Sequence, residues 1–324
     1  MSTASGLERE IECPASAVLS PIVQESGEHA ERGDAIHVFC RSVIAGTPRV
    51  LALAQVPEGP WRETCEQIDF DILCGGVTDV RAEVAYRIDL EAETARELGL
   101  NLGRRYPKRL PHEVDGTNDF EGRRANGRLV FTDIKTGFHL VTLCRDNPQM
   151  LFHAAALMLV HGVDEVEGRI GYIDVGGVIR FDAHVFTPLD VDRYLDTLRA
   201  RRGRIARANE MLRGGARLEV HAGPWCRYCP AKVACPRFTA LAHAMLDDLR
   251  DVHQKWGTLS KEQRAEAYLM AAEAKDLAER IVESMKDIAR TAPIALPAGK
   301  ELRETSAGVR VVNAPKPERR RRSA

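Results

Sequence analysis

The stretch from Val114 to Gly137, VDGTNDFEGRRANGRLVFTDIKTG, constrains the fold of this chain more than any other part of the sequence. Its two segments flank the turn residues Ala125-Asn126-Gly127, which predicts one β-hairpin. If Gly127 takes the left-handed conformation in a three-residue loop, Asp119 lies opposite Asp133 on the same face of the sheet. Strand periodicity then places Lys135 on that face as well.

Two carboxylates this close repel each other unless a cation lies between them, and oxygen ligands favour magnesium or manganese. A neighbouring lysine can orient a water nucleophile or neutralise a phosphorane-like transition state. The hairpin therefore predicts a divalent-metal site at Asp119, Asp133 and Lys135. The alternative is a surface hairpin with polar residues on its solvent face, and spacing alone does not separate the two interpretations.

Composition narrows the class of protein. The chain has 324 residues, of which 44% are hydrophobic and 6% aromatic, as in ordinary soluble globular proteins. A net charge of -1 neither supports nor excludes a DNA partner. We find neither an apolar run long enough to cross a membrane nor a secretory signal, so we expect a cytoplasmic protein without a membrane partner. Eight cysteines in such a protein indicate metal or cluster ligation rather than disulfides.

An aspartate on one strand, followed on the next by Asp-x-Lys-Thr-Gly, resembles the core of the PD-(D/E)xK nuclease superfamily, and specifically its RecB-like exonuclease branch. The resemblance covers roughly Glu12 to Phe238. It implies an α/β fold with a restriction-endonuclease-like core, in which helices flank a mixed central sheet.

A helix predicted over Ala30–Gly46 carries His37 among apolar neighbours. A lone histidine in that setting is ordinarily a core or surface residue. The first motif of the resembling family, however, is Gly-x-x-x-His on a helix, which Gly33 and His37 match, and the resemblance implies that His37 is a metal ligand. Glu83, on a strand predicted over Arg81–Asp89, is either a further acid near the site or, as the pattern favours, a solvent-facing residue.

After the hairpin, Asn147-Pro148 marks the start of an apolar helix over Gln149–Val160. In the resembling family this helix carries Gln-x-x-x-Tyr, whose glutamine contacts the substrate backbone near the scissile phosphate. Gln149 matches, whereas the fifth position is His153, which can still stack or donate a hydrogen bond. The alternative role for Gln149 is that of a helix cap.

Two later elements complete the predicted core. A second hairpin over Gly168–Val185, turned at Gly176-Gly177, extends the sheet. A helix capped by Thr187 and Asp190 runs to Arg213. We expect the arginines of this helix to form a solvated face rather than a DNA-binding surface.

Cys226, Cys229 and Cys235 follow the spacing Cys-x2-Cys-x5-Cys with flanking prolines, which predicts a ligand loop without identifying the metal. Because three thiolates leave a four-ligand centre one short, we assign Cys13 as the fourth; like Cys229 and Cys235, it precedes a proline. The arrangement resembles iron-sulfur nucleases of the AddB type and of the CRISPR-associated Cas family. There, one cysteine before the nuclease core and three after it hold a 4Fe-4S cluster. A Zn²⁺ site with the same ligands is the alternative.

The predicted domain organisation has three parts: a nuclease domain with the cysteine cluster over residues 12–238, a helical appendage over 239–292, and a small hairpin with a basic tail over 293–324.

These expectations add up to a metal-dependent DNA exonuclease acting on single strands or ends in recombination, repair or mobile-element processing. His37, Asp119, Asp133 and the Ile134 carbonyl would bind one or two Mg²⁺ or Mn²⁺ ions, Lys135 would position the hydrolytic water, and Gln149 would hold the DNA backbone. The resemblance leaves open a helicase or recombination partner. The competing hypothesis is a non-catalytic module of nuclease fold that binds DNA ends or another protein.

Overall fold

The fold was analysed in a computed structural model. It divides into two compact units, one comprising Met1–Val18 and Ser26–Glu219 and the other Leu19–Glu25 and Val220–Ala324. Apart from scattered residues between 257 and 290, the structure describes residues 3–19, 28–103, 105–136, 141–226, 229–231, 235–237, 293–296, 300–306 and 308–313.

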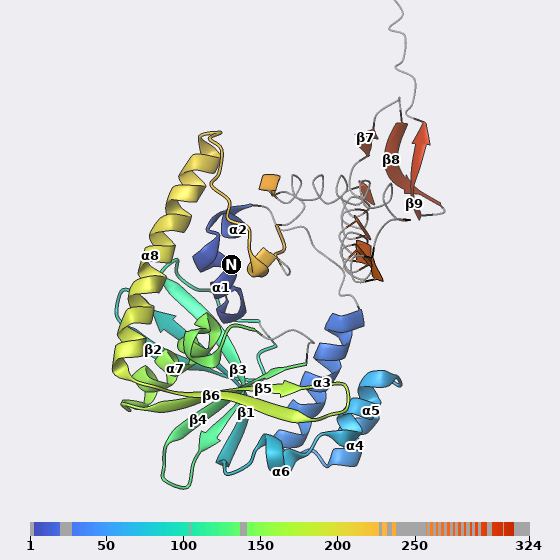
Figure 1. The fold of residues 1–324 in the computed structure, drawn as a ribbon. Coiled ribbons are helices and arrows are strands. Elements are labelled where there is room, and N and C mark those ends of the chain that lie inside the picture. Colours follow the sequence, from blue (N-terminus) through green and yellow to red (C-terminus); the bar gives the residue numbers. More distant parts are fainter. Residues whose placement is uncertain are drawn as a thin grey trace, which may run out of the picture. The chain divides into compact units, whose positions relative to one another are not determined.

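The first unit is built on a six-stranded sheet with strand order β2-β1-β3-β4-β5-β6 (Figure 1). Neighbouring strands are antiparallel except β4 and β5, which are parallel, so the sheet is mixed. The strand bounds are Thr78–Asp89 for β1, Thr94–Leu100 for β2, Glu113–Arg123 for β3, Leu129–Lys135 for β4, Val166–Ile173 for β5 and Ile179–Phe186 for β6. The predicted α/β core with helices flanking a mixed sheet is confirmed.

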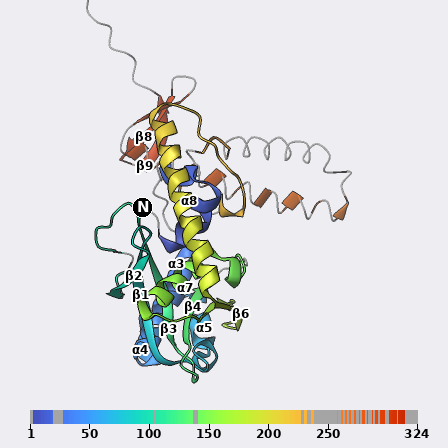
Figure 2. The ribbon, with the colours of Figure 1, turned by 90° about the vertical axis from the view of Figure 1, so that its left-hand side faces the viewer.

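Helices cover both faces of this sheet, and each face has its own apolar core. One core packs α7 (Pro148–His161) and α8 (Pro188–Arg213) against the sheet, and α8 lies beside α7 (Figure 2). The other core packs α3 (Glu28–Ile44), α4 (Arg49–Ala54), α5 (Pro60–Gln67) and α6 (Phe70–Leu73). Among the helices that the structure describes, none is long and apolar enough to cross a bilayer.

The β3–β4 hairpin forms as its turn sequence predicts. Gly127 has φ +83°, its amide donates to the carbonyl of Arg124, and the Arg124 amide donates to the carbonyl of Arg128. The ladder pairs Phe120 with Thr132. One further step along this antiparallel register brings Asp119 opposite Asp133, because the sum of paired residue numbers is constant along such a ladder.

Local signals also fix the later elements. Asn147 caps α7 by accepting from the Gln149 and Met150 amides, and Thr187 forms a capping box with Asp190 at the start of α8. The β5–β6 hairpin turns at Gly176 and Gly177, as predicted.

The start of the chain is helical. The short helices η1 (Ala4–Gly6), α1 (Leu7–Glu12) and α2 (Ala15–Val18) occupy it, and Leu7 is completely buried. Glu10 of α1 forms a buried ion pair with Arg201 of α8. Tertiary packing, rather than helical periodicity, stabilises elements this short.

The described part of the second unit contains η3 (Pro224–Cys226) and an antiparallel three-stranded sheet. Its strands are β7 (Ile294–Leu296), β8 (Lys300–Thr305) and β9 (Gly308–Asn313), in the order β7-β8-β9. The basic tail from Lys316 onward lies outside the described residues. The domain boundaries that we expected at residues 238 and 292 remain predictions.

Candidate active site

Asp119 is the point at which α3 meets the central hairpin. Nδ1 of His37 lies 3.0 Å from Oδ1 of Asp119, and the backbone amide of Ile134 donates to the other carboxylate oxygen. The side chains of His37 and Asp119 are 32% and 17% exposed, so solvent reaches this pair. A helix residue and a strand residue 82 positions apart in the sequence are thus brought into direct contact.

Gly33 lets α3 approach the end of β4. A Cβ atom at this position would lie only 3.3 Å from Oγ1 of Thr136, the residue that follows Lys135. One helical turn later, His37 reaches Asp119. The Gly-x-x-x-His pattern therefore has a steric reason as well as a chemical one.

Asp133 is held from the α7 side. Nε2 of Gln149 donates to its Oδ1 at 2.7 Å, and Nζ of Lys135 lies 2.7 Å from its Oδ2. Lys135 also donates to Oε1 of Gln149 at 3.2 Å, which closes a triangle of three side chains. The Asn147 side chain caps the helix, so the Gln149 side chain is not needed as a cap and instead points toward the hairpin.

The pKa values of the two carboxylates are shifted in opposite directions. Burial alone would raise the pKa of Asp119, but the charge and hydrogen bond of His37 and the Ile134 amide together lower it. Burial raises the pKa of Asp133, and the charge of Asp119 adds to that increase, although Lys135 acts against it. The pKa of His37 is raised, because the attraction of Asp119 exceeds the effect of burial. Asp119 is therefore the more readily ionised of the two carboxylates, and Asp133 the less.

This set of groups fits a hard divalent cation in its chemistry. Carboxylate oxygens with one imidazole suit Mg²⁺ or Mn²⁺. Oδ2 of Asp133 is buried and lies 2.7 Å from Nζ of Lys135. Within the described residues, however, no group of three or more His, Cys, Asp or Glu side chains already converges as a metal-binding set.

His153 occupies the position of the family's tyrosine, one turn after Gln149. It is completely buried between Phe131 and Phe152, with ring centroids 5.6 and 5.2 Å away. Neither ring nitrogen has a hydrogen-bond partner among the described residues. His153 meets Phe152 edge-on and Phe131 at a tilt, so among the described residues it neither stacks face to face nor donates a hydrogen bond.

Sequence reasoning gave little weight to two further residues beside the site. Glu83, which we expected to face solvent, is only 18% exposed and lies 4.0 Å from Arg41 of α3. Arg41 follows His37 by four positions, and this helical spacing was the available signal that it faces the same way.

The four cysteines assigned to a cluster are only partly described. Cys13 is buried in the first unit, whereas Cys226, Cys229 and Cys235 belong to the second. The Cys229 amide donates to the Cys226 carbonyl at 3.2 Å. The cluster itself remains a prediction.

Two of the α8 arginines that we expected on a solvated face are partly exposed and pair with acids of the same unit. Arg199 pairs with Glu93 and Asp196, and Arg202 lies 2.8 Å from Glu91. These pairs attach α8 to the turn between β1 and β2.

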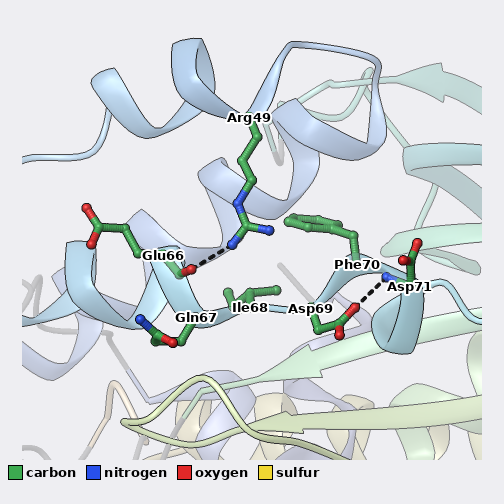
Figure 3. A pocket seen from close by; sticks show the side chains of 7 residues that line it. All are labelled: Arg49, Glu66, Gln67, Ile68, Asp69, Phe70 and Asp71. Carbon is green, nitrogen blue, oxygen red and sulfur yellow. Dashed lines mark hydrogen bonds between the residues drawn. The ribbon is translucent and has the colours of Figure 1, made fainter.

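A hollow with a volume of about 410 Å³ lies over α4, α5 and α6, away from these residues (Figure 3). Its lining consists of Arg49, Glu66, Gln67, Ile68, Asp69, Phe70 and Asp71. Arg49 donates to the carbonyls of Cys65 and Glu66 and lies over the Phe70 ring. Because this guanidinium holds the end of α5, we interpret the hollow as structural.

Comparison with known proteins places this geometry in a family. No curated protein matches the sequence. A match among solved structures, titled "Crystal structure of SSO0001", is 18% identical, covers 71% of this chain and 94% of that one, and has a TM-score of 0.27. The model of the PD-(D/E)XK nuclease superfamily matches residues 2–236, which include both carboxylates, the lysine and the glutamine. The chain therefore belongs to the PD-(D/E)XK nuclease superfamily.

Proposed function

We propose that this protein is a metal-dependent DNA exonuclease of the RecB-like branch, acting on single strands or ends. The observation that carries the proposal is the contact of Asp133 with both Lys135 and Gln149, next to an Asp119 held by His37. A module that only binds DNA has no need for two neighbouring, mutually repelling acids beside a lysine. The absence of a base-reading motif in the sequence supports attack on ends rather than cutting at a specific sequence.

The proposed roles follow from the contacts. His37, Asp119 and Asp133, with the Ile134 carbonyl, would hold one or two Mg²⁺ or Mn²⁺ ions, which supply Lewis-acid stabilisation of the phosphate charge. Lys135 would orient the water that attacks phosphorus, since its ammonium group is already fixed between Asp133 and Gln149. Gln149 would keep the Asp133 carboxylate in one orientation, and Gln149 itself would also contact the DNA backbone.

The test is degradation of end-labelled single- and double-stranded DNA in Mg²⁺, Mn²⁺ or EDTA. Asp133→Asn keeps the shape of the side chain but removes its charge, and Asp146→Asn, whose side chain is 60% exposed, is the control. We expect cleavage that EDTA abolishes, that Asp133→Asn loses and that Asp146→Asn retains. The product ladder gives the polarity. Unchanged cleavage by Asp133→Asn would contradict the assignment, and binding without cleavage by the wild type would favour the binding module.

We further propose that Cys13, Cys226, Cys229 and Cys235 hold a 4Fe-4S cluster. The spacing and the Cys226–Cys229 hydrogen bond support a ligand loop. Protein purified without oxygen should be brown and contain iron. Cys229→Ser should lose both properties, whereas Cys74→Ser, a half-buried thiol outside the set, should keep them. A colourless protein with stoichiometric zinc would establish the zinc alternative.

A further inference from the structure

Arg41 lies on the same side of α3 as His37, because side chains four positions apart on a helix are neighbours. Its Nη1 lies 4.0 Å from Oε1 of Glu83, and the arginine side chain is 32% exposed. At this separation the carboxylate orients the guanidinium without a direct hydrogen bond between these two atoms.

The partners of His37 and Arg41 are themselves neighbours in the sheet. β1 and β3 pair Ala82 with Phe120 and Val84 with Asn118, so the intervening Glu83 lies opposite Asp119. His37 contacts Asp119 on β3, while Arg41 lies next to Glu83 on β1. Two parallel contacts from one helix thus fix Arg41 beside the proposed metal site.

The backbone of Glu83 is unusual at this position. It has φ +52°, in the left-handed region that residues other than glycine rarely adopt, although it lies within β1. Its carbonyl accepts from the Asn101 amide at 3.0 Å, which helps to hold this conformation. Such backbone strain gathers at functional sites, where surrounding structure imposes the direction of a side chain.

We propose that Arg41 binds a backbone phosphate of the nucleic acid next to the hydrolysed bond, and that Glu83 positions its guanidinium. The inference rests on the proposed nuclease function and adds a substrate contact to it. Glu83, Asp119 and Asp133 lie on three neighbouring strands, β1, β3 and β4, so a polyanion needs cationic groups to approach this part of the sheet. Lys135 already faces Asp133, whereas Arg41 presents a partly exposed guanidinium, whose fork of donors matches phosphate oxygens.

The test measures DNA binding separately from cleavage. A fluorescently labelled single-stranded oligonucleotide is titrated with protein in EDTA over a range of salt concentrations. Arg41→Ala should weaken binding about tenfold, the effect of losing one charge-assisted contact. It should also reduce the slope of log K against log salt by about 0.7, the value for one phosphate contact on a single strand. Arg41→Lys should keep the slope, because the counterion release that the slope measures depends on the charge, but it should not restore the full affinity that the guanidinium fork provides.

Arg62 offers a matched control. It is 31% exposed, lies on a helix and is flanked by Glu58 and Glu66, so Arg62→Ala removes an equally exposed ion-paired arginine. We expect this variant to bind as the wild type does. Glu83→Gln should raise KM for cleavage with little change in kcat, because it disturbs the position of Arg41 alone.

Failure of this inference can be distinguished from failure of the proposed function. If the wild type cleaves DNA and Arg41→Ala, with an unchanged melting temperature, keeps the wild-type salt slope, Arg41 is not a phosphate contact. If the wild type does not cleave, the proposed function fails and this inference falls with it. Loss of slope in both Arg41→Ala and Arg62→Ala would also overturn it, because the effect would then be one of general charge.

Discussion

His153 makes the stability of the nuclease core depend on pH. It is completely buried against two phenylalanine rings, and burial lowers its pKa from 6.5 to about 3. The folded protein therefore excludes a proton that the unfolded chain binds. Between these two pKa values the unfolded state binds more protons, so the free energy of unfolding rises with pH and is lost as the solution is acidified.

The size of the effect follows from the shift. One pKa unit corresponds to about 1.4 kcal/mol, so the full shift is worth about 5 kcal/mol at pH values well above 6.5. Over the accessible interval from pH 7.5 to pH 5, one such group lowers the free energy of unfolding by about 2 kcal/mol. His153→Leu removes this contribution. It also removes two buried nitrogens without partners among the described residues, so at pH 7.5 the variant should be at least as stable as the wild type.

Urea unfolding followed by circular dichroism, in EDTA at both pH values, measures these quantities. The wild type should lose about 2 kcal/mol more than His153→Leu between pH 7.5 and pH 5. His161 lies at the exposed end of the same helix, so His161→Leu should respond nearly as the wild type does. If the wild type and His153→Leu lost the same free energy on acidification, the histidine would be hydrated or partnered in solution, and the reasoning from burial would be wrong.

Two more predictions concern hydrogen-bonded carboxylates. Gln149→Ala removes the donor that holds Asp133, so it should lower activity at limiting Mg²⁺ about 10- to 100-fold, as the loss of an outer-shell partner of a metal ligand does. A magnesium titration of DNA cleavage measures this loss, and full activity would contradict the proposed role of Gln149. Arg87 is 2% exposed and forms two hydrogen bonds with Asp115, so Arg87→Met should cost about 3–5 kcal/mol of unfolding free energy by leaving buried acids unpaired. In the same urea assay the 55% exposed Arg96, replaced by methionine, should cost less than about 1 kcal/mol, and equal losses would refute the distinction.

The parts of the fold that could be predicted from the sequence are those with a local physical cause. The hairpin register follows from the loop length and from Gly127, whose positive φ the turn requires. The start of α7 follows from Asn147 and Pro148, and that of α8 from the capping box at Thr187. In each case a few adjacent residues determine the conformation, so the sequence carries the information without knowledge of tertiary contacts.

Other elements are not determined by a few adjacent residues, so the sequence gives no local signal for them. β2, with the sequence TARELGL, is an edge strand without apolar alternation, and its pairing with β1 defines it. α1 has six residues and is stabilised by packing and by the ion pair of Glu10 with Arg201. The left-handed Glu83 in β1 is a further case, because non-glycine strand residues give no signal of a positive φ. Its approach to Arg41 had to come from the structure.

The site shows why a resemblance could locate His37 when spacing could not. Asp133, Lys135 and Gln149 meet because they are close in sequence, on a strand and on the helix that follows it. His37 comes from the opposite face of the sheet, and it reaches Asp119 only because Gly33 lets α3 come within a side chain's width of Thr136. The glycine and the histidine thus act together across one helical turn. Gly33 allows the short distance between helix and hairpin, and at that distance the His37 side chain contacts Asp119. A pattern of two residues in one helix therefore encodes a tertiary contact that neither residue predicts alone.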